Sequence, residues 1–316
     1  MKEELIISGR NLPHIDPHLE LWHWPISLYL FLGGLAAGIL FFAALVTLFR
    51  KEDKYIGAVK YATIIAPIAI AIGLIALLYD LTHVLYAWRL YVTIRLESPM
   101  SWGAWTLMLV MPISILWTLS YFKEYFPTWN WKEGLLSYVD WTIDFINKYK
   151  RVLAWILVPS TIILGIYTGI LLSAFNARPL WNNPILGPLF LTSGLSTGAA
   201  AIILLSKSHK ERKMFSMIDL VLIGIELFLI THMLMGMIAG SQVQLEASQL
   251  LLGGEFTIPF FVFVVILGLA FPAILEIFEL VGFKVPAVIP ALLVLLGGIM
   301  FRFIMVEAGQ LTRYLY

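Results

Sequence analysis

Several side chains that can accept and release protons stand within or beside long apolar stretches of this sequence. The first is the histidine of the segment Trp22-His23-Trp24. An unperturbed histidine takes up and releases a proton around neutral pH, and the two tryptophans offer flat apolar walls. The segment therefore predicts a proton acceptor beside an apolar slot. In the alternative interpretation, the tryptophans belong to an aromatic belt at a membrane surface and His23 is a hydrated neighbour.

Further ionisable groups lie inside the apolar stretches, where they are costly and hence candidates for function. Asp80 and His83 are three residues apart, so they share a face if this stretch is helical. Asp80 would then lie about eight residues, or roughly 12 Å, below the outer end of the helix. Four residues form a hypothetical proton path into the interior: Asp80, His83, Glu226 and His232. In the alternative interpretation, each makes a hydrogen bond between helices, and this is favoured for His232, Glu276 and Glu279.

The composition indicates where these groups reside. Of 316 residues, 60% are hydrophobic and only 13% charged, the mean hydropathy is +0.88, and a soluble domain carries about 25% charged residues. The sequence predicts an all-α integral membrane protein, a single membrane domain over residues 1–316. Helices 1–3 are expected within 24–122, helix 4 at 151–175 and helices 5–8 within 185–305. The eight expected spans are 24–48, 61–88, 102–122, 151–175, 185–206, 217–240, 256–280 and 286–305, each long enough to cross a bilayer.

Charge and cysteine content exclude other classes. The formal net charge of +1 gives no basic field for nucleic acid. Because the protein has no cysteine, it cannot itself ligate an iron–sulfur cluster through thiolates or attach a c-type haem. We expect no metal site, no haem and no iron–sulfur cluster on this polypeptide, so such chemistry belongs to another subunit.

Lysine and arginine are distributed unevenly between alternate connections. Fourteen of the 21 lie in the set that contains residues 50–60 and 123–151, and seven in the other set. Since basic residues are retained on the cytoplasmic side, both termini are predicted outside. The connection at 123–150 is predicted to be a cytoplasmic amphipathic helix on the inner membrane surface. Its apolar residues at helical spacing are Leu135, Val139, Ile143 and Ile146.

An internal repeat appears at an offset of 160 residues. The segment Gly34-Leu35-Ala36-Ala37-Gly38 matches Gly194-Leu195-Ser196-Thr197-Gly198. Small residues four apart allow membrane helices to approach closely. The repeat predicts two four-helix bundles in parallel orientation.

The predicted outer connections carry specific motifs. Two of them read ESPMSWGAW at 97–105 and RPLWNNP at 178–184, and the C-terminal part of the sequence reads GGIMFR at 297–302 and AGQ at 308–310. Together with the WHW segment and Tyr79-Asp80-Leu81, they resemble the NrfD/PsrC family, the membrane subunits of polysulfide reductase and related molybdoenzyme complexes. The resemblance extends over essentially all eight spans; the connection at 123–150 is longer than the family pattern needs.

The resemblance implies a quinol-oxidising anchor in the cytoplasmic membrane. Such an anchor binds menaquinol or a related quinol near the outer face. It passes two electrons to a ferredoxin-like iron–sulfur subunit, which feeds a molybdopterin catalytic subunit; a dimer of such complexes is also expected. The terminal acceptor lies with the catalytic subunit: polysulfide or sulfur is the first choice, and tetrathionate, thiosulfate or nitrite are alternatives.

Quinol oxidation needs an apolar slot, hydrogen-bonding groups at the ring oxygens and a route for protons. The resemblance implies that the histidine of the WHW segment and a tyrosine of the fourth span line this pocket. Tyr167 lies about nine residues, or roughly 13 Å, from Asn176 at the outer end. The expected quinone-binding residues are Trp22, His23, Trp24 and Tyr167, and the expected catalytic residues are His23, Asp80 and Tyr167.

Seven residues at the predicted outer face are expected to organise the loops or dock the iron–sulfur subunit. They are Ser98, Pro99, Trp102, Trp181, Asn182, Arg302 and Gln310. An arginine near the end of a membrane helix commonly extends to the interface, so docking is favoured over catalysis for Arg302.

Two other classes remain as alternatives. A b-type cytochrome anchor would need pairs of histidines on facing helices. His14, His18 and His209 lie outside the spans, which leaves a single conceivable haem between His83 and His232. A proton-coupled secondary transporter would explain the repeat and the buried carboxylates, but such proteins often carry matching Gly- or Pro-broken helices, and the prolines here do not match between the halves.

Overall fold

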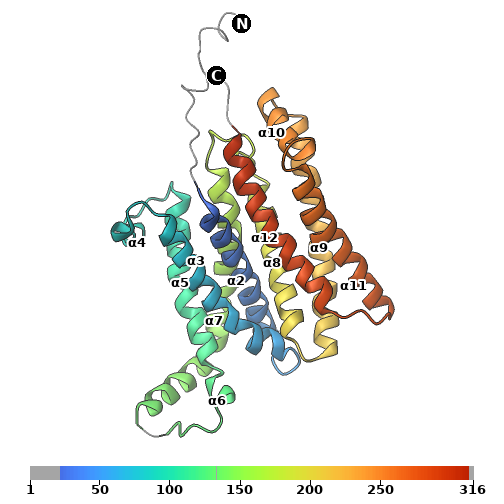
Figure 1. Cartoon of the computed structure of the whole chain (residues 1–316). Coiled ribbons are helices and arrows are strands. Elements are labelled where there is room, and N and C mark those ends of the chain that lie inside the picture. The colour runs from blue at the N-terminus through green and yellow to red at the C-terminus, as the bar shows by residue number, and fades with distance from the viewer. Residues whose placement is uncertain (1–21, 133, 313–316) are drawn as a thin grey trace, which may run out of the picture.

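The computed structural model describes residues 22–132 and 134–312, and in these ranges the protein forms helices and no strands (Figure 1). Eight of the described helices are long and apolar enough to cross a membrane. They are α2 (Trp24–Leu48), the continuous run of η1 (Gly57–Tyr61), η2 (Ala62–Ile64) and α3 (Ile65–Asp80), α5 (Pro99–Leu119), α7 (Leu135–Ser173), α8 (Leu186–Leu205), α9 (His209–Ile238), the run of η4 (Pro259–Ala270) and α11 (Phe271–Val281), and α12 (Val288–Leu311). The predicted all-helical, multi-pass architecture is confirmed.

Four short helices lie outside these spans: η3 (Val84–Tyr86), α4 (Arg89–Val92), α6 (Phe122–Tyr125) and α10 (Gln242–Leu252). Local signals set several boundaries. Pro25 and Pro99 stand in the first turns of α2 and α5, where the missing N–H of proline costs nothing. Ser241 and Gln244 form a capping box at the start of α10, and Gly282, with a φ of 111°, ends α11.

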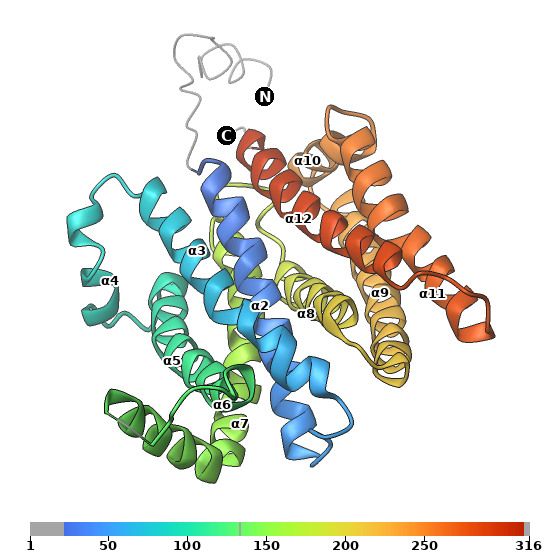
Figure 2. The same cartoon turned by 60° about the horizontal axis from the view of Figure 1, so that its bottom comes forward.

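The helices alternate in direction between two ends of the bundle (Figures 1 and 2). At one end, which we call the Trp22 end, α2 and α5 begin and α3, α7 and α12 end. The opposite end, which we call the Lys60 end, holds η1, α6 and the junction between α8 and α9. Which end faces the cytoplasm, and the grouping into two four-helix bundles, stay predictions.

The two copies of the repeat pack against each other. A Cβ atom added to Gly38 would overlap the carbonyl oxygen of Gly194, and one added to Gly198 would overlap the backbone of Gly38. Gly34 and Gly194 also meet backbone to backbone. The predicted close approach is therefore confirmed: the glycines of α2 and α8 form the crossing point of these two helices.

Several helix ends differ from the predicted boundaries. The second span stops at Asp80 instead of residue 88, because Leu81 adopts an extended backbone with a ψ of 126°. The segment that follows is largely exposed, and its His83, Trp88 and Arg89 are side chains that suit a water-facing turn. Asp80 and His83 consequently do not share a helical face. The eighth span runs to Leu311 instead of residue 305, since hydropathy marks where apolar composition stops and not where a helix stops.

The predicted separate surface helix is also different in the structure. Its residues form the first turns of α7, which continues without a break from Leu135 to Ser173. Ile143 and Ile146 are buried in the protein and do not face a membrane surface. The cause is the preceding hairpin: Lys123 of the α6 turn pairs with Asp140 and Asp144 and holds α6 near this part of α7. These hydrogen bonds raise the pKa of Lys123.

The glycine crossing generates the first prediction. Gly198→Ala places a methyl group in the backbone of α2, so we expect a loss of about 1–3 kcal/mol of stability, typical of overpacking. The matched control is Gly224→Ala on α9, where a Cβ meets no atom within 4 Å; alanine is the better helix former, so this variant should be as stable as the parent or more so. Thermal unfolding in mild detergent measures both. Equal melting temperatures for the two variants would show that the crossing is not tight.

Candidate functional site

His23 and Asp80 form a pair at the Trp22 end. His23 precedes the first turn of α2 and Asp80 is the last residue of α3, so each side chain stands at a helix terminus. The distance between Nδ1 of His23 and Oδ1 of Asp80 is 2.9 Å. The imidazole is 60% exposed and the carboxylate side chain 9% exposed. A carboxylate in this position orients the imidazole.

The two tryptophans beside His23 have different surroundings. Trp22 is half-buried, and its ring packs on Phe175 and Trp181 at centroid distances of 4.8 and 5.1 Å. The Trp22 backbone is held on both sides by the amide of Gln310, which accepts from its N–H at 2.7 Å and donates to its carbonyl at 2.8 Å. Trp24 is 58% exposed, with Tyr79 6.4 Å away. The structure thus fixes the backbone at Trp22 and leaves Trp24 open to its surroundings.

The prediction that Trp181 docks a partner is wrong, because its side chain is fully buried. Its indole N–H donates to the carbonyl of Met305 at 2.7 Å. Gly309 makes room for the ring, since a Cβ there would overlap the indole. Arg178 donates to the carbonyls of Gln310 and Thr312. These contacts join the connection between α7 and α8 to the end of α12.

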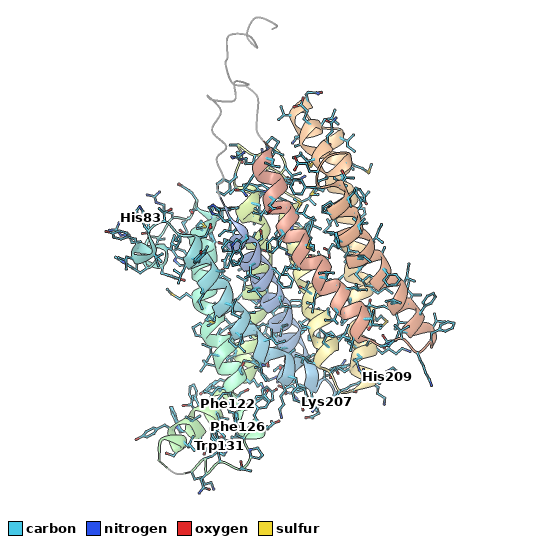
Figure 3. All side chains as sticks on the ribbon, viewed as in Figure 1. His83, Phe122, Phe126, Trp131, Lys207 and His209 are labelled. Carbon is cyan, nitrogen blue, oxygen red and sulfur yellow. The ribbon has the colours of Figure 1, made fainter. Side chains whose placement is uncertain are left out.

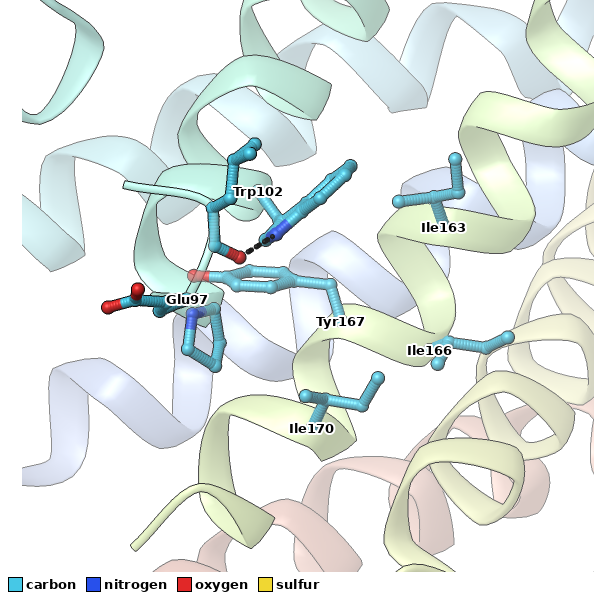
Figure 4. A pocket seen from close by; sticks show the side chains of 8 residues that line it. Glu97, Trp102, Ile163, Ile166, Tyr167 and Ile170 are labelled. Atoms are coloured by element: carbon cyan, nitrogen blue, oxygen red, sulfur yellow. Dashed lines mark hydrogen bonds between the residues drawn. The ribbon is translucent and has the colours of Figure 1, made fainter. Parts of the chain in front are cut away.

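A cavity of about 370 Å³ lies between the beginning of α5 and the last turns of α7 (Figure 4). Its lining residues are Leu96, Glu97, Pro99, Trp102, Ile163, Ile166, Tyr167 and Ile170. The indole of Trp102 donates to the carbonyl of Leu96 at 2.8 Å, which fixes the rim. The cavity is mainly apolar with a few polar groups, as is usual for small-molecule sites.

Tyr167 lines this cavity from α7. Its side chain is 5% exposed, and Gly103 of α5 provides the space for its ring. The Tyr167 hydroxyl lies 3.9 Å from the sulfur of Met100, and Tyr29 of α2 lies beside Tyr167. The predicted pocket tyrosine therefore does line a pocket. His23, Trp22 and Trp24 are at the same end of the bundle but are not among its lining residues.

Glu97 is a cavity residue to which sequence reasoning gave no role. Its carboxylate stands at the exposed side of the cavity. The signal that could have identified it is its position directly before the SPMSWG motif, on a connection predicted at the same end as His23. Beside Tyr167, it is the second ionisable group of the cavity lining.

The remaining docking candidates lie around this end. Trp102 is 46% exposed, and its neighbours Ser98 and Pro99 are half-buried, as are Asn182 and Gln310. Gln310 also fixes the Trp22 backbone, as described above. Their position at the Trp22 end is compatible with loop organisation, and docking stays a prediction.

The four residues of the hypothetical proton path are not brought together. His83, labelled in Figure 3, lies in the exposed turn after α3, where its ring contacts Tyr86. His232 is exposed on α9 and stacks on Phe228. The turn with His83 and helix α9 lie on opposite sides of the bundle in both views (Figures 1 and 2), so these histidines do not form the facing pair that a haem would need. Glu226 is buried.

Arg302 lies in the interior of the protein, which contradicts its predicted place at the surface. The side chain is fully buried in the middle of α12. Its guanidinium donates to the hydroxyl of Ser193 and to the carbonyls of Phe190 and Gly298. Glu226 of α9 is also buried and lies close enough for its charge to interact with that of Arg302. The opposite charge and the three hydrogen-bond acceptors keep the arginine in the interior.

A second buried cluster joins α8, α9 and α11. Asp219 accepts a hydrogen bond of 2.5 Å from Ser196, and Glu279 accepts from Ser216 at 3.5 Å. Asp219 and Glu276 are both 0% exposed, and neither carboxyl oxygen of Glu276 has a hydrogen-bond partner. The predicted interhelical hydrogen bond of Glu279 is therefore confirmed, whereas the one predicted for Glu276 is wrong.

The buried Arg302 leads to a double-mutant prediction. We expect Arg302→Met to destabilise the protein by about 3–5 kcal/mol, because it leaves the Glu226 carboxylate buried without its counter-charge. Adding Glu226→Gln to Arg302→Met should recover part of the loss, whereas adding Glu246→Gln, which changes an exposed carboxylate of α10, should recover none. Thermal unfolding of the four proteins in detergent gives the coupling. Additive effects of Arg302→Met and Glu226→Gln would contradict the pairing.

Comparison with known proteins gives consistent results over nearly the whole sequence. A family model described as "Polysulphide reductase, NrfD" matches residues 14–313. The C subunit of polysulfide reductase from Wolinella succinogenes is 32% identical over 304 residues, which cover 92% of this protein and 94% of that one. Protein NrfD of Escherichia coli is 32% identical over 312 residues, covering 93% and 97%. The NrfD homolog of Haemophilus influenzae is 28% identical over 323 residues, covering 95% and 98%.

Proposed function

Because this protein belongs to the NrfD family of multi-pass membrane subunits, we propose that it is the quinol-oxidising anchor of a respiratory oxidoreductase complex. It binds menaquinol or a related quinol at the Trp22 end and passes the electrons to a partner protein. The anchor holds the quinol site, and the terminal catalytic site is on another subunit.

The observation that carries this proposal is the cavity between α5 and α7. Its volume of about 370 Å³ falls in the range of small-molecule sites. Ile163 and Ile170 of its lining are 43% and 42% exposed on the outside of a membrane-spanning helix, so the cavity opens toward the lipid side. An apolar ligand dissolved in the bilayer reaches such a site without crossing water.

The polar groups of this end suit the chemistry. A quinol, when bound, supplies two electrons and two protons. Tyr167 and Glu97 of the cavity lining are available to hydrogen-bond ring oxygens, Tyr167 from the buried side and Glu97 from the exposed side. His23, paired with Asp80, accepts a proton and releases it to water, since its imidazole is largely exposed. Trp22, fixed by Gln310, holds the entry of α2 in place.

The electrons must leave to another protein because this one has no cysteine with which to hold a cluster. The Wolinella succinogenes relative is named as a lettered subunit of a polysulfide reductase, which describes it as one part of an assembly. We propose a ferredoxin-like iron–sulfur subunit as the electron acceptor and a molybdopterin subunit beyond it, both docked at the Trp22 end on the outer face of the cytoplasmic membrane. Polysulfide or sulfur is the proposed terminal substrate, by analogy with that relative.

A second candidate function is proton transfer coupled to quinol oxidation. The observation that favours it is the series of buried ionisable groups in the second half of the sequence: Asp219, Glu226, Glu276, Glu279 and Arg302. Such groups are rare in membrane spans unless they serve transport or pair with one another. Of the four residues predicted for a proton path, Glu226 alone belongs to this series.

Filling the cavity tests the quinol site. Ile166→Trp places an indole inside the cavity, so we expect quinol oxidation by the membrane complex to fall at least tenfold, with a raised KM. The control is Ile156→Trp, which adds the same bulk to a partly exposed position of α7 outside the cavity lining. Stopped-flow oxidation of a menaquinol analogue measures both. Unchanged KM and turnover in Ile166→Trp would place the quinol elsewhere.

Asp80→Asn tests proton acceptance by the His23 pair. Loss of the carboxylate that supports the imidazole should slow quinol oxidation by about 100-fold, the lower range of general-base effects, while quinol binding measured by fluorescence quenching stays within about twofold. Glu255→Gln is the control, an exposed carboxylate at the same end. If Asp80→Asn retains normal turnover and proton release, the pair has no part in the mechanism.

A further inference from the structure

Helix α7 keeps one register over its whole length. At 100° per residue, its exposed apolar side chains fall within an arc of about 120°. They are Tyr138, Trp141, Phe145, Tyr149, Val152, Trp155, Ile156, Ile163 and Ile170. Most side chains buried in the protein lie on the opposite part of the circumference, among them Ile143, Ile146, Ala154, Leu157, Leu164 and Leu172, whereas the buried Tyr167 lies at the edge of the exposed arc. The stripe that faces lipid in the bundle therefore continues into the first turns of the helix.

The stripe is longer than a bilayer core. From Tyr138 to Ile170 it extends over 32 residues, about 48 Å at helical rise, whereas the hydrocarbon core is about 30 Å thick. The Ile170 end of the stripe borders the cavity at the Trp22 end. The length by which the stripe exceeds the bilayer core therefore projects from the Lys60 end. Figure 1 shows these first turns beyond the bundle, near α6.

The composition of the stripe changes along its length. Within the bundle it consists of isoleucine and valine with a single aromatic residue, Trp155, whereas all four exposed apolar residues of the projecting part are aromatic. Tyr138, Trp141 and Phe145 are 72%, 68% and 51% exposed, and Trp141 and Phe145 stack at a centroid distance of 5.7 Å. Tryptophan and tyrosine prefer the head-group region of a bilayer.

We propose that the face formed by Tyr138, Trp141, Phe145 and Tyr149, which we call the aromatic face, binds the head-group layer of the membrane at the Lys60 end. The first turns of α7 therefore lie against the bilayer surface and anchor α7 there. The membrane surface contacted is opposite to the one where the quinol is proposed to bind.

Part of the remaining surface of these turns contacts the protein. Asp140 and Asp144 hold Lys123 of the α6 turn, and Ile143 and Ile146 are buried. The aromatic face continues, along the same helix, the row of side chains that face lipid in the bundle. Lipid therefore covers both parts. The electron-accepting partner is proposed at the other end of the molecule and does not reach this face.

The absence of cysteine permits a direct test with single-cysteine variants of the full-length protein. Phe145→Cys is labelled with an environment-sensitive fluorophore and reconstituted into phosphatidylcholine nanodiscs, with and without head-group spin-labelled lipid. The matched control is Asn147→Cys, two residues away, exposed and on the other side of the helix. Tyr138→Cys provides a second position on the aromatic face.

We expect the spin-labelled lipid to quench the label at 145 and at 138 at least threefold more than the label at 147, and aqueous iodide to show the reverse order. Equal quenching at all three positions would overturn the proposal. Protection of 145 and 138 from both quenchers would also overturn it, because a protein, a second copy of this one included, would then cover the face. Thermal unfolding of each labelled variant verifies that the fold is intact.

Discussion

The backbone contact between α2 and α8 is the constraint on which the rest of this bundle depends. Gly34, Gly38, Gly194 and Gly198 bring the two helices closer than any side chain would permit, and in a membrane such packing substitutes for the hydrophobic effect as the source of association. Gly34 and Gly298 also leave room for the guanidinium of Arg302. Placement of α2 then determines which groups reach its neighbours: His23 meets Asp80 of α3, and Tyr29 meets Tyr167 of α7.

The sequence allowed the eight spans and close packing at the glycines to be predicted, because both follow from local composition. Hydropathy located each span within a few residues at its apolar centre. Small residues four apart indicated close packing at these helices, but not that α2 and α8 would pack against each other. The ends were less accurate, as α3 and α7 illustrate: a helix stops or continues according to hydrogen bonds and tertiary contacts. The pairing of Asp80 with His23, 57 residues apart, was not deduced as a contact, although both were assigned to one site.

Arg302 and Trp181 show why burial could not be deduced. Each stands in a motif near a predicted helix end, where an arginine or a tryptophan is usually exposed. Arg302 is buried because Glu226 and Ser193, from two other helices, offer a charge and a hydroxyl. Trp181 is buried because Gly309 leaves a space for it. Neither partner is visible from the local sequence, and the same is true of Lys123, which joins α6 to the first turns of α7.

The charge pair inside the bundle also bears on biosynthesis. Helices enter the membrane in sequence order, so α9 with Glu226 is inserted before α12 with Arg302. Until α12 arrives, Glu226 lies in the nascent bundle without the opposite charge of Arg302, which is costly in a membrane. Docking of α12 then brings in the arginine, which donates hydrogen bonds to Ser193 and Phe190. Helix α12, which follows α9 and α11 in the sequence, is thus the one that completes this polar interior, so assembly of this part of the bundle waits for α12.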